Sequence, residues 1–506
     1  MRPSIIVPVL GAAAAAFAVA DKPTALGLNL TTAEAGNPLF DGWYADPEIR
    51  VYDDVFWIYA TTSIAFKDQK HFDAFSSTDL IHWWAPTATK GNDGKYYLYF
   101  SSHNGVQSQK QPNAGLAVAV ADQPGGPFRD ALNGARLIDH SIHGANPMDS
   151  DAFTDDDGKK YLYFGGGESC VGILSDSMTS FVGLHGEESP KSDADTFKKV
   201  TPRPSNYVEG TKVFKRNGTY YLMWSENGYG EPTYQVAYAT SASPLGPFKP
   251  RGLVLTQDPT IGVATGHNSV LNIPKTDIWY IVYHRRPLHE SNADSRVVAL
   301  DRMYFNEDGS IKPIELLAKD NFDDGDLSEH LWQRKSGDWQ FLADEKHNEG
   351  GKSLRGSADR DQPGLILMDS HFADLVYDVD ITLEEEGAEA GLTFRTAPSR
   401  RKGKPARFNG YAVWLKAKTG EVVLIHQKGK RKMITTDLGK SSERHVKNGI
   451  KYHVRVEFKG QQVSVFVDDM KAPIISARDD KDTSGQNGLL VGTDRALFDN
   501  VSIRHT

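Results

Sequence analysis

A short phrase recurs along the chain: a turn, then a run of aromatic and aliphatic residues. Asp-Gly or Asn-Gly before such a run is typical of a β-hairpin, so each copy is predicted to be the second strand of a hairpin. The clear copies are DGKYYLYF (93–100), DGKKYLYF (157–164) and NGTYYLMW (217–224), and the looser ones are DDVFWIYA (53–60) and TDIWYIVY (276–283).

The spacing of these copies predicts the architecture. The equivalent residues Trp57, Tyr97, Tyr161, Tyr221 and Tyr280 follow one another at intervals of 40, 64, 60 and 59 residues. A period of about 60 residues suits four short antiparallel strands with their loops, so five copies predict a five-bladed β-propeller. A β-sandwich of hairpins is the competing fold, but a recurring period favours radial repetition. The first interval is about 20 residues short, which indicates that a strand-connecting loop is missing near residues 77–90.

Near residue 318 the repeat gives way to longer alternating strands. Apolar residues occupy every second position in LVYDVDITL (375–383), YHVRVEF (452–458) and VSVFV (463–467). Alternation with period two indicates strands with one buried and one solvated face. We therefore expect an all-β protein, with a propeller over residues 21–318 and a concanavalin-like β-sandwich over residues 319–506.

The first 20 residues, MRPSIIVPVLGAAAAAFAVA, have the pattern of a secretory signal peptide. The protein is therefore expected to be secreted and extracellular, with no membrane span. Its one cysteine, Cys170, excludes an internal disulfide. A formal charge of −9 argues against nucleic-acid and anionic-membrane partners. We expect a monomer that acts on a neutral substrate.

Three acidic residues stand at equivalent places in the repeat. Asp46, Asp149 and Glu209 each lie eight residues ahead of a turn residue in their own copy. In a propeller such positions converge near the axis, where crowded carboxylates raise at least one pKa. One carboxyl with a raised pKa and one that stays ionised form the pair that hydrolyses glycosidic bonds. The alternative is that these acids cap turns or bind a cation. Pro47 is expected to hold Asp46 in an extended conformation.

Four segments together resemble glycoside hydrolase family 43: YADPEIRV, MDSDAFTDDDGKKYLYF, NYVEGTKVFKRNGTYYLMWS and GHNSV. The resemblance runs from about residue 36 to residue 315 and implies an inverting mechanism. It implies that Asp46 is the general base, that Glu209 is the general acid and that Asp149 tunes pKa and orientation. Ser150 departs from the family, which usually has proline there.

The resemblance also implies residues around the acids. His267 matches a histidine at the channel centre that often contacts calcium, directly or through water, so calcium is expected to be structural and not required for the chemistry. A buried, hydrogen-bonded histidine is the alternative. Arg286, in YHRRP, is expected to reach the sugar because a guanidinium fork suits vicinal hydroxyls. The candidate sugar platforms are Trp43, Tyr44, Trp84 and Trp224, of which Trp224 is expected to be a core residue instead.

The segment NPLFDGWYADPE and the attached sandwich resemble fungal α-L-arabinofuranosidases. This likeness implies a hydrolase that removes arabinofuranosyl side chains from the plant cell-wall polysaccharides arabinoxylan and arabinan. β-Xylosidase and endo-arabinanase activities of the same family remain alternatives. A carbohydrate-binding propeller without turnover is the alternative from another class, and the short first repeat favours it.

Overall fold

The computed structural model describes residues 36–64, 68–69, 72–80, 89–103, 114–343, 351–359, 362–398, 408–429 and 433–506. The proposed signal peptide (1–20) and Trp84 lie outside these residues. Almost all regular structure of these residues is β, and the one helix among them, α1 (Asp193–Thr196), has a single turn. No helix in the described part of the chain has the length and apolar character needed to cross a bilayer.

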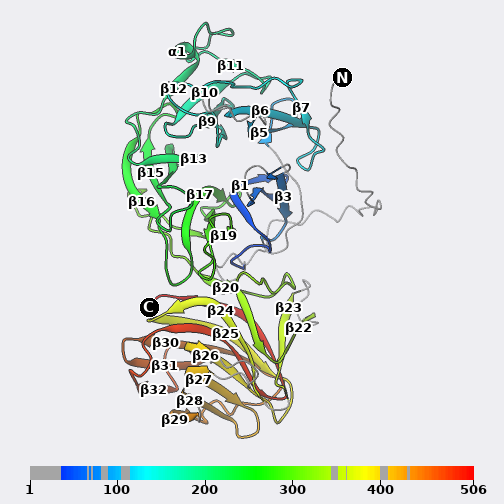
Figure 1. Cartoon of the computed structure of the whole chain (residues 1–506), viewed down its shortest axis with the longest axis vertical. Coiled ribbons are helices and arrows are strands. Elements are labelled where there is room, and N and C mark those ends of the chain that lie inside the picture. The colour runs from blue at the N-terminus through cyan, green and yellow to red at the C-terminus, as the bar shows by residue number, and fades with distance from the viewer. Residues whose placement is uncertain are drawn as a thin grey trace. The chain divides into compact units, whose positions relative to one another are not determined.

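The N-terminal part contains five antiparallel sheets that follow one another along the chain, from blue to green in Figure 1. The first sheet holds β1 (Tyr44–Tyr52), β2 (Val55–Thr62) and β3 (Phe72–Ser77). The second holds β4 (Thr89–Lys90), β5 (Tyr96–His103), β6 (Ala114–Ala121) and β7 (Arg129–Asp130). The third holds β8 (Asp151–Thr154), β9 (Lys160–Phe164), β10 (Cys170–Leu174), β11 (Phe181–Val182) and β12 (Phe197–Lys199).

The fourth sheet holds β13 (Tyr207–Arg216), β14 (Thr219–Glu226), β15 (Gln235–Ser241) and β16 (Lys249–Leu255), and the fifth holds β17 (Val263–Asn272), β18 (Trp279–Arg286) and β19 (Val297–Met303). In each of these five sheets, the second strand carries a copy of the repeated phrase and pairs antiparallel with the strand before it. The hairpin prediction is therefore confirmed for all five copies.

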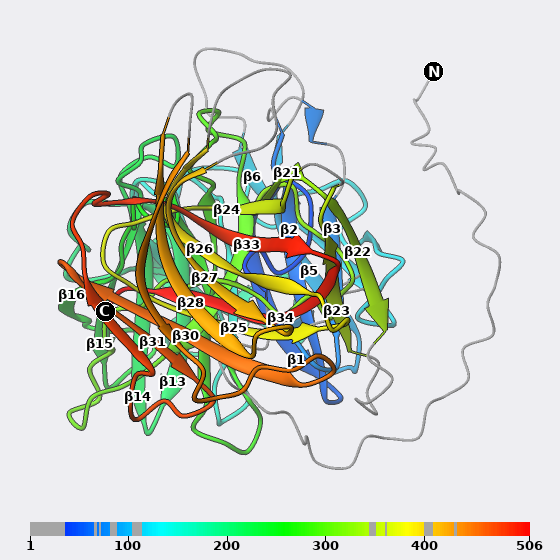
Figure 2. The same ribbon diagram turned by 90° about the horizontal axis from the view of Figure 1, so that it is seen from below.

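The C-terminal part contains two antiparallel sheets. One has the order β22-β23-β34-β25-β30-β31-β32, with β20 also paired to β34, and the other has the order β21-β24-β33-β26-β27-β28-β29. Figure 2 shows β33, β26, β27 and β28 running side by side. The strands are β20 (Ala318–Asp320), β21 (Trp332–Ser336), β22 (Asp338–Ala343), β23 (Lys352–Ser357), β24 (Gly364–Phe372), β25 (Leu375–Leu383), β26 (Glu389–Pro398), β27 (Phe408–Lys416), β28 (Glu421–Lys428), β29 (Ile434–Ser441), β30 (Lys451–Lys459), β31 (Gln462–Val467), β32 (Ile475–Arg478), β33 (Gly485–Thr493) and β34 (Arg495–Arg504).

The alternation seen in the sequence corresponds to burial between these two sheets. In β30, the residues Tyr452, Val454, Val456 and Phe458 are buried, while their neighbours are partly or fully exposed. They share one hydrophobic core with residues of the other sheet, such as Leu392. The prediction of strands with one buried face is confirmed.

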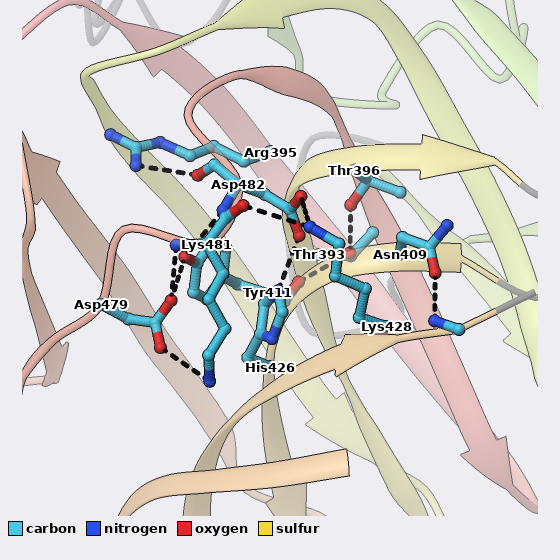
Figure 3. A network of polar contacts seen from close by, with 11 residues as sticks. Thr393, Arg395, Thr396, Asn409, Tyr411, His426, Lys428, Asp479, Lys481 and Asp482 are labelled. Carbon is cyan, nitrogen blue, oxygen red and sulfur yellow. Dashed lines mark hydrogen bonds and ion pairs between the residues drawn. The ribbon is translucent and has the colours of Figure 1, made fainter. Parts of the chain in front are cut away.

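A polar network holds the loop after β32 against β27 and β28 (Figure 3). Asp482 accepts from Lys428 Nζ at 2.9 Å and lies 2.6 Å from His426 Nε2. Tyr411 donates its hydroxyl to Asp479 at 2.6 Å. Side chains buried in the sheet thus satisfy the charges of the loop, as buried polar groups require.

Candidate active site

Asp46 lies in a β-bulge of β1. The register with β2 pairs Ala45 with Thr61 but Glu48 with Tyr59, so one extra residue is inserted in between. Asp46 there has φ of 52°, and the expectation of an extended Asp46 was wrong. A bulge re-aims a side chain and twists the strand locally, and this effect outweighs the preference that Pro47 imposes on its neighbour.

Basic groups surround the carboxylate of Asp46. Its Oδ1 lies 3.2 Å from His267 Nδ1, 3.3 Å from His284 Nδ1 and 3.3 Å from Arg296 Nη1. Burial alone would raise the pKa of Asp46, but His267 and Arg296 outweigh burial and hold the pKa well below its usual range. Asp46 is therefore a carboxylate at any ordinary pH.

Glu209 lies beside a second bulge, in β13. The pairing with β14 slips between Glu209 and Lys212, and Gly210 has φ of 68°. The Tyr234 hydroxyl donates to Glu209 Oε1 at 2.9 Å. Burial raises the pKa of Glu209, and the charge of Asp46 adds to the rise while His267 opposes it.

Asp149 comes two residues before β8 and also has a positive φ, of 49°. Its Oδ2 is buried and has no hydrogen-bond partner among the described residues. Burial is the main reason that the pKa of Asp149 is raised to about 7; His267 opposes this rise, and the carboxylates of Glu209 and Asp46 add to it. A carboxyl in this state holds its proton in mildly acidic solution.

His267 joins the acids. It has φ of 46° in a bulge of β17, and its backbone N–H donates to Ser225 Oγ at 2.9 Å. One ligand atom from each of Asp149, Glu209 and His267 lies within 4.8 Å of the other two. Burial lowers the pKa of His267, but Asp46, Asp149 and Glu209 outweigh it and raise the pKa. The three carboxyl groups thus favour the protonated form of His267.

The same three side chains could supply a cation with two carboxylate oxygens and one imidazole nitrogen. Calcium takes about six to eight oxygen ligands, so these residues fit it only if water completes most of the coordination shell. Asp149 Oδ2, which has no partner in the described part of the chain, is the atom best placed to accept such a contact.

Three further residues of the site were missed from the sequence. His284 is fully buried, and its Nδ1 accepts the Asp46 backbone N–H at 3.2 Å, which places its proton on Nε2. Burial lowers the pKa of His284 to about 4 and keeps the ring neutral. Arg296 also donates through Nε to Ser63 at 2.9 Å, and the Tyr234 ring stacks on His284.

Of these three, only His284 had a signal in the sequence. It lies two residues before Arg286 on β18, and alternation places both side chains on one face of that strand. Arg296 and Tyr234 lie outside every repeated or family-like segment, so only the fold identifies them.

The expected sugar-binding residues lie at different depths. Arg286 is buried, and its Nη1 donates to Gly230 O at 3.3 Å. The ring of Trp43 lies 3.8 Å from that of His330, and the Tyr44 hydroxyl donates to Asp73 at 3.1 Å.

Trp224, the third aromatic candidate within the described residues, is only 1% exposed and belongs to the core, as expected.

A cavity of about 320 Å³ opens beside Asp46 and Asp149, and Glu209 is not among the described residues that line it. Asp46, Asp149 and His267 form part of its wall, and the aromatic residues Tyr97 and Tyr99 of β5 form another part. Neither Trp43 nor Tyr44 is among the described residues that line it. The cavity combines apolar walls with a few convergent charged groups, as small-molecule sites do.

Comparison with known proteins identifies the family. Residues 84–311 match the model of glycosyl hydrolases family 43, and residues 318–504 match a 3-keto-alpha-glucoside-1,2-lyase-like domain. The chain is 38% identical over 322 residues to the beta-D-galactofuranosidase xynD of Aspergillus niger, an alignment that covers 58% of this chain and 88% of that protein. It is 29% identical over 342 residues to an arabinoxylan arabinofuranohydrolase of Paenibacillus polymyxa, covering 55% of this chain and 51% of that one.

Among solved structures, a thermostable family-43 glycoside hydrolase is similar, with 24% identity, coverage of 55% of this chain and 95% of that one, and a TM-score of 0.45. The match to the family model, together with the 38% identity over most of the Aspergillus niger enzyme, shows that this chain belongs to glycoside hydrolase family 43.

Proposed function

We propose that this protein is a secreted, inverting glycoside hydrolase that removes α-L-arabinofuranosyl side chains from arabinoxylan and arabinan. The observation that carries the proposal is that two carboxyls in one cluster have opposite pKa shifts. The pKa of Asp46 is lowered and the pKa of Glu209 is raised. Hydrolysis with inversion needs this combination, because one carboxylate activates water while one carboxylic acid protonates the leaving oxygen.

In this mechanism Asp46 accepts a proton from the attacking water, and Glu209 gives its proton to the glycosidic oxygen. His267 and Arg296 keep Asp46 ionised through the reaction. Burial and the charge of Asp46 favour the protonated form of Glu209, and Asp149 tunes the pKa and orientation of that acid. An inverting pair is separated by about 6.5–9.5 Å, which leaves room for the water.

The names of two relatives support a furanoside as the substrate, since one is an arabinofuranohydrolase and the other a galactofuranosidase. α-L-Arabinofuranose and β-D-galactofuranose have the same ring configuration and differ by one exocyclic CHOH group. A β-D-galactofuranoside is therefore the second candidate substrate, favoured by the 38% identity to the Aspergillus niger enzyme. β-Xylosidase and endo-arabinanase activities are the remaining alternatives within the family.

The test is a comparison of initial rates on three 4-nitrophenyl glycosides: α-L-arabinofuranoside, β-D-galactofuranoside and β-D-xylopyranoside. Arabinose release from wheat arabinoxylan and from arabinan is measured beside them. The arabinofuranoside and arabinoxylan are expected to react fastest. A preference for the galactofuranoside, or release of xylose alone, would replace the proposed substrate. Proton NMR of the first sugar released should show the inverted anomer.

A carbohydrate-binding protein without turnover is distinguished by Asp46→Asn. The hydrolase loses about 10²–10⁴-fold in kcat when its general base is removed, whereas a binding protein has near-zero rates in both forms and retains its affinity. Glu307→Gln, which neutralises an exposed acid, is the matched control and should leave the rate unchanged.

The proposal includes the architecture. The five sheets are the blades of a closed propeller over residues 21–318, and residues 319–506 form a β-sandwich that packs against it. One hydrophobic core that contains Phe214 and Tyr283 also contains Trp332 and Phe372, which supports this packing. Removal of residues 319–506 should therefore yield an unstable fragment, measured by thermal unfolding.

Secretion, a monomeric state and a structural calcium ion complete the proposal. N-terminal sequencing of protein from the culture medium should begin at Asp21, and light scattering should give the mass of one chain. Metal analysis should find calcium, and its removal by a chelator should lower the Tm while leaving kcat on the folded protein unchanged.

A further inference from the structure

Four charged side chains form a closed group next to the candidate acids. They are Glu48 and Arg50 of β1, Asp151 of β8 and Lys212 of β13. The Lys212 and Asp151 side chains are only 2% and 3% exposed, and those of Arg50 and Glu48 are 19% and 30% exposed. We call these four residues the charge ring.

Each member of the charge ring contacts two others. Lys212 Nζ lies 2.7 Å from Glu48 Oε1 and 3.0 Å from Asp151 Oδ1. Arg50 Nη2 lies 2.7 Å from Asp151 Oδ1, and Arg50 Nη1 pairs with Glu48 Oε1. Asp151 Oδ2 also accepts the backbone N–H of Val213 at 2.8 Å. Two cations and two anions thus balance within one group.

The positions of these residues in the strands relate the charge ring to the acids. Glu48 comes two residues after Asp46, and Asp151 comes two residues after Asp149. Lys212 comes three residues after Glu209, and the bulge at Gly210 accounts for the additional residue. Each acid is therefore followed within three residues by a member of the charge ring.

The three strands belong to three different sheets, and no ladder of the described strands joins one of these sheets to another. Their spacing near the acids is set by side-chain packing and by the charge ring. Stability alone is a weak reason for such a group, because well-packed apolar residues often replace buried ion pairs without loss. The contacts within the charge ring instead link three strands and constrain the distances between them.

We propose that the charge ring, with Lys212 at its centre, is a positioning group that sets the distances between Asp46, Asp149 and Glu209. The inference rests on the proposed hydrolase function. In this role Lys212 affects the rate of the chemical step, since a displacement of about 1 Å in a reacting group can cost about a hundredfold in rate. Glu48, Arg50 and Asp151 also line the cavity, whereas Lys212 is not among its described lining residues.

The test compares Lys212→Met with the double variant Glu48→Gln/Lys212→Met, in which the remaining Arg50–Asp151 pair is neutral overall. Tm, kcat and KM are measured on 4-nitrophenyl α-L-arabinofuranoside. Lys212→Met leaves an uncompensated buried charge, so both Tm and kcat should fall. The double variant should recover most of the Tm, while its kcat stays about tenfold to a hundredfold below wild type.

Lys215→Met is the matched control. Lys215 lies on the same strand and pairs with Asp155 at 2.6 Å and with Asp156 at 2.9 Å, and neither of these acids belongs to the charge ring. Its loss should lower the Tm and leave kcat unchanged. Wild-type kcat in the double variant would overturn the proposal, because the charge ring would then serve only to balance charge.

A crystal structure of the double variant separates this inference from the proposed function. The Glu209 carboxyl should move by about 1 Å relative to Asp46, a shift that is seen whether or not any glycoside is cleaved. Unmoved carboxyls would overturn the positioning role. A wild-type protein that cleaves no glycoside would refute the hydrolase function instead.

Discussion

Asp46 Oδ1 lies 3.2 Å from His267 Nδ1, and both residues have left-handed backbone conformations, with φ of 52° and 46°. They come from the first strands of the first and the fifth sheet. Each stands in a β-bulge, which turns a side chain away from the direction that regular alternation would give it. The contact brings a protonated imidazole to the carboxylate, and the predictions below follow from the resulting charge distribution.

Glu209→Gln should affect substrates according to their leaving group. The variant cannot protonate the glycosidic oxygen, so arabinose release from arabinoxylan should fall about 10²–10⁴-fold. Nitrophenolate leaves without a proton, so hydrolysis of 4-nitrophenyl α-L-arabinofuranoside should fall much less. Asp46→Asn should slow both reactions alike, and equal losses on both substrates in Glu209→Gln would contradict its role as the acid.

The rate should have an alkaline limit near neutrality. The pKa of Asp149 is raised to about 7 and the pKa of Glu209 is also raised, and the two carboxyls titrate as a coupled pair. Glu209 needs its proton to act as the general acid. We expect kcat/KM to fall as the pH rises through about 7. The lowered pKa of Asp46 should keep the activity high down to about pH 4. A pH profile centred above neutrality would be inconsistent with these pKa shifts.

Arg296→Met should move the whole profile to higher pH. Arg296 lowers the pKa of both Asp46 and Glu209, so its loss raises both. A shift of about one pH unit is expected for the removal of a charge at this distance. Arg302→Met is the control, because Arg302 lies over the rings of Tyr280 and Tyr304 and should leave the profile unchanged.

Trp224→Ala should reduce stability rather than sugar binding. The side chain is 1% exposed in the core of the fourth sheet, and its Nε1 donates to Ser205 O at 3.2 Å. Loss of a buried tryptophan costs about 3–5 kcal/mol of unfolding free energy, measurable by urea denaturation. KM of the folded protein should stay unchanged. An altered KM with full stability would return Trp224 to the set of sugar platforms.

His453 should make the C-terminal part more stable below neutral pH than above it. Hydrogen bonds to Asp378 and Asp380 raise the pKa of His453 to about 9. This contribution is fully present below the unfolded pKa of about 6.5 and is lost as the pH rises through about 9. Its size is small because the side chain is 39% exposed.

The Tm of wild type and of His453→Gln should therefore differ most below about pH 6.5 and converge toward alkaline pH. His371→Gln, which changes an exposed histidine of β24, is the control. A Tm difference that grows with pH would have the wrong sign and would contradict the assignment.

Local patterns in the sequence predicted the secondary structure well, and the acids in part. The turn and aromatic run around Tyr221 predicted a hairpin, and the alternation from Tyr452 to Phe458 predicted a half-buried strand, because both depend on neighbouring residues alone. The equal offset of Asp46, Asp149 and Glu209 from their turns indicated that they converge. The same reasoning was wrong about the backbone of Asp46, because a bulge depends on the register with the partner strand.

The amino-acid sequence by itself predicted the strands, their hairpins and the equal offset of three acids from their turns, since period, turn chemistry and spacing are properties of short segments. Only the tertiary structure decided which charges meet. Arg296, His284 and Tyr234 reach the acids from distant segments. His267 and Arg296 hold the pKa of Asp46 low, while burial and the charge of Asp46 raise the pKa of Glu209. Coulomb interactions and burial depend on distances in space, which no short segment of the chain encodes.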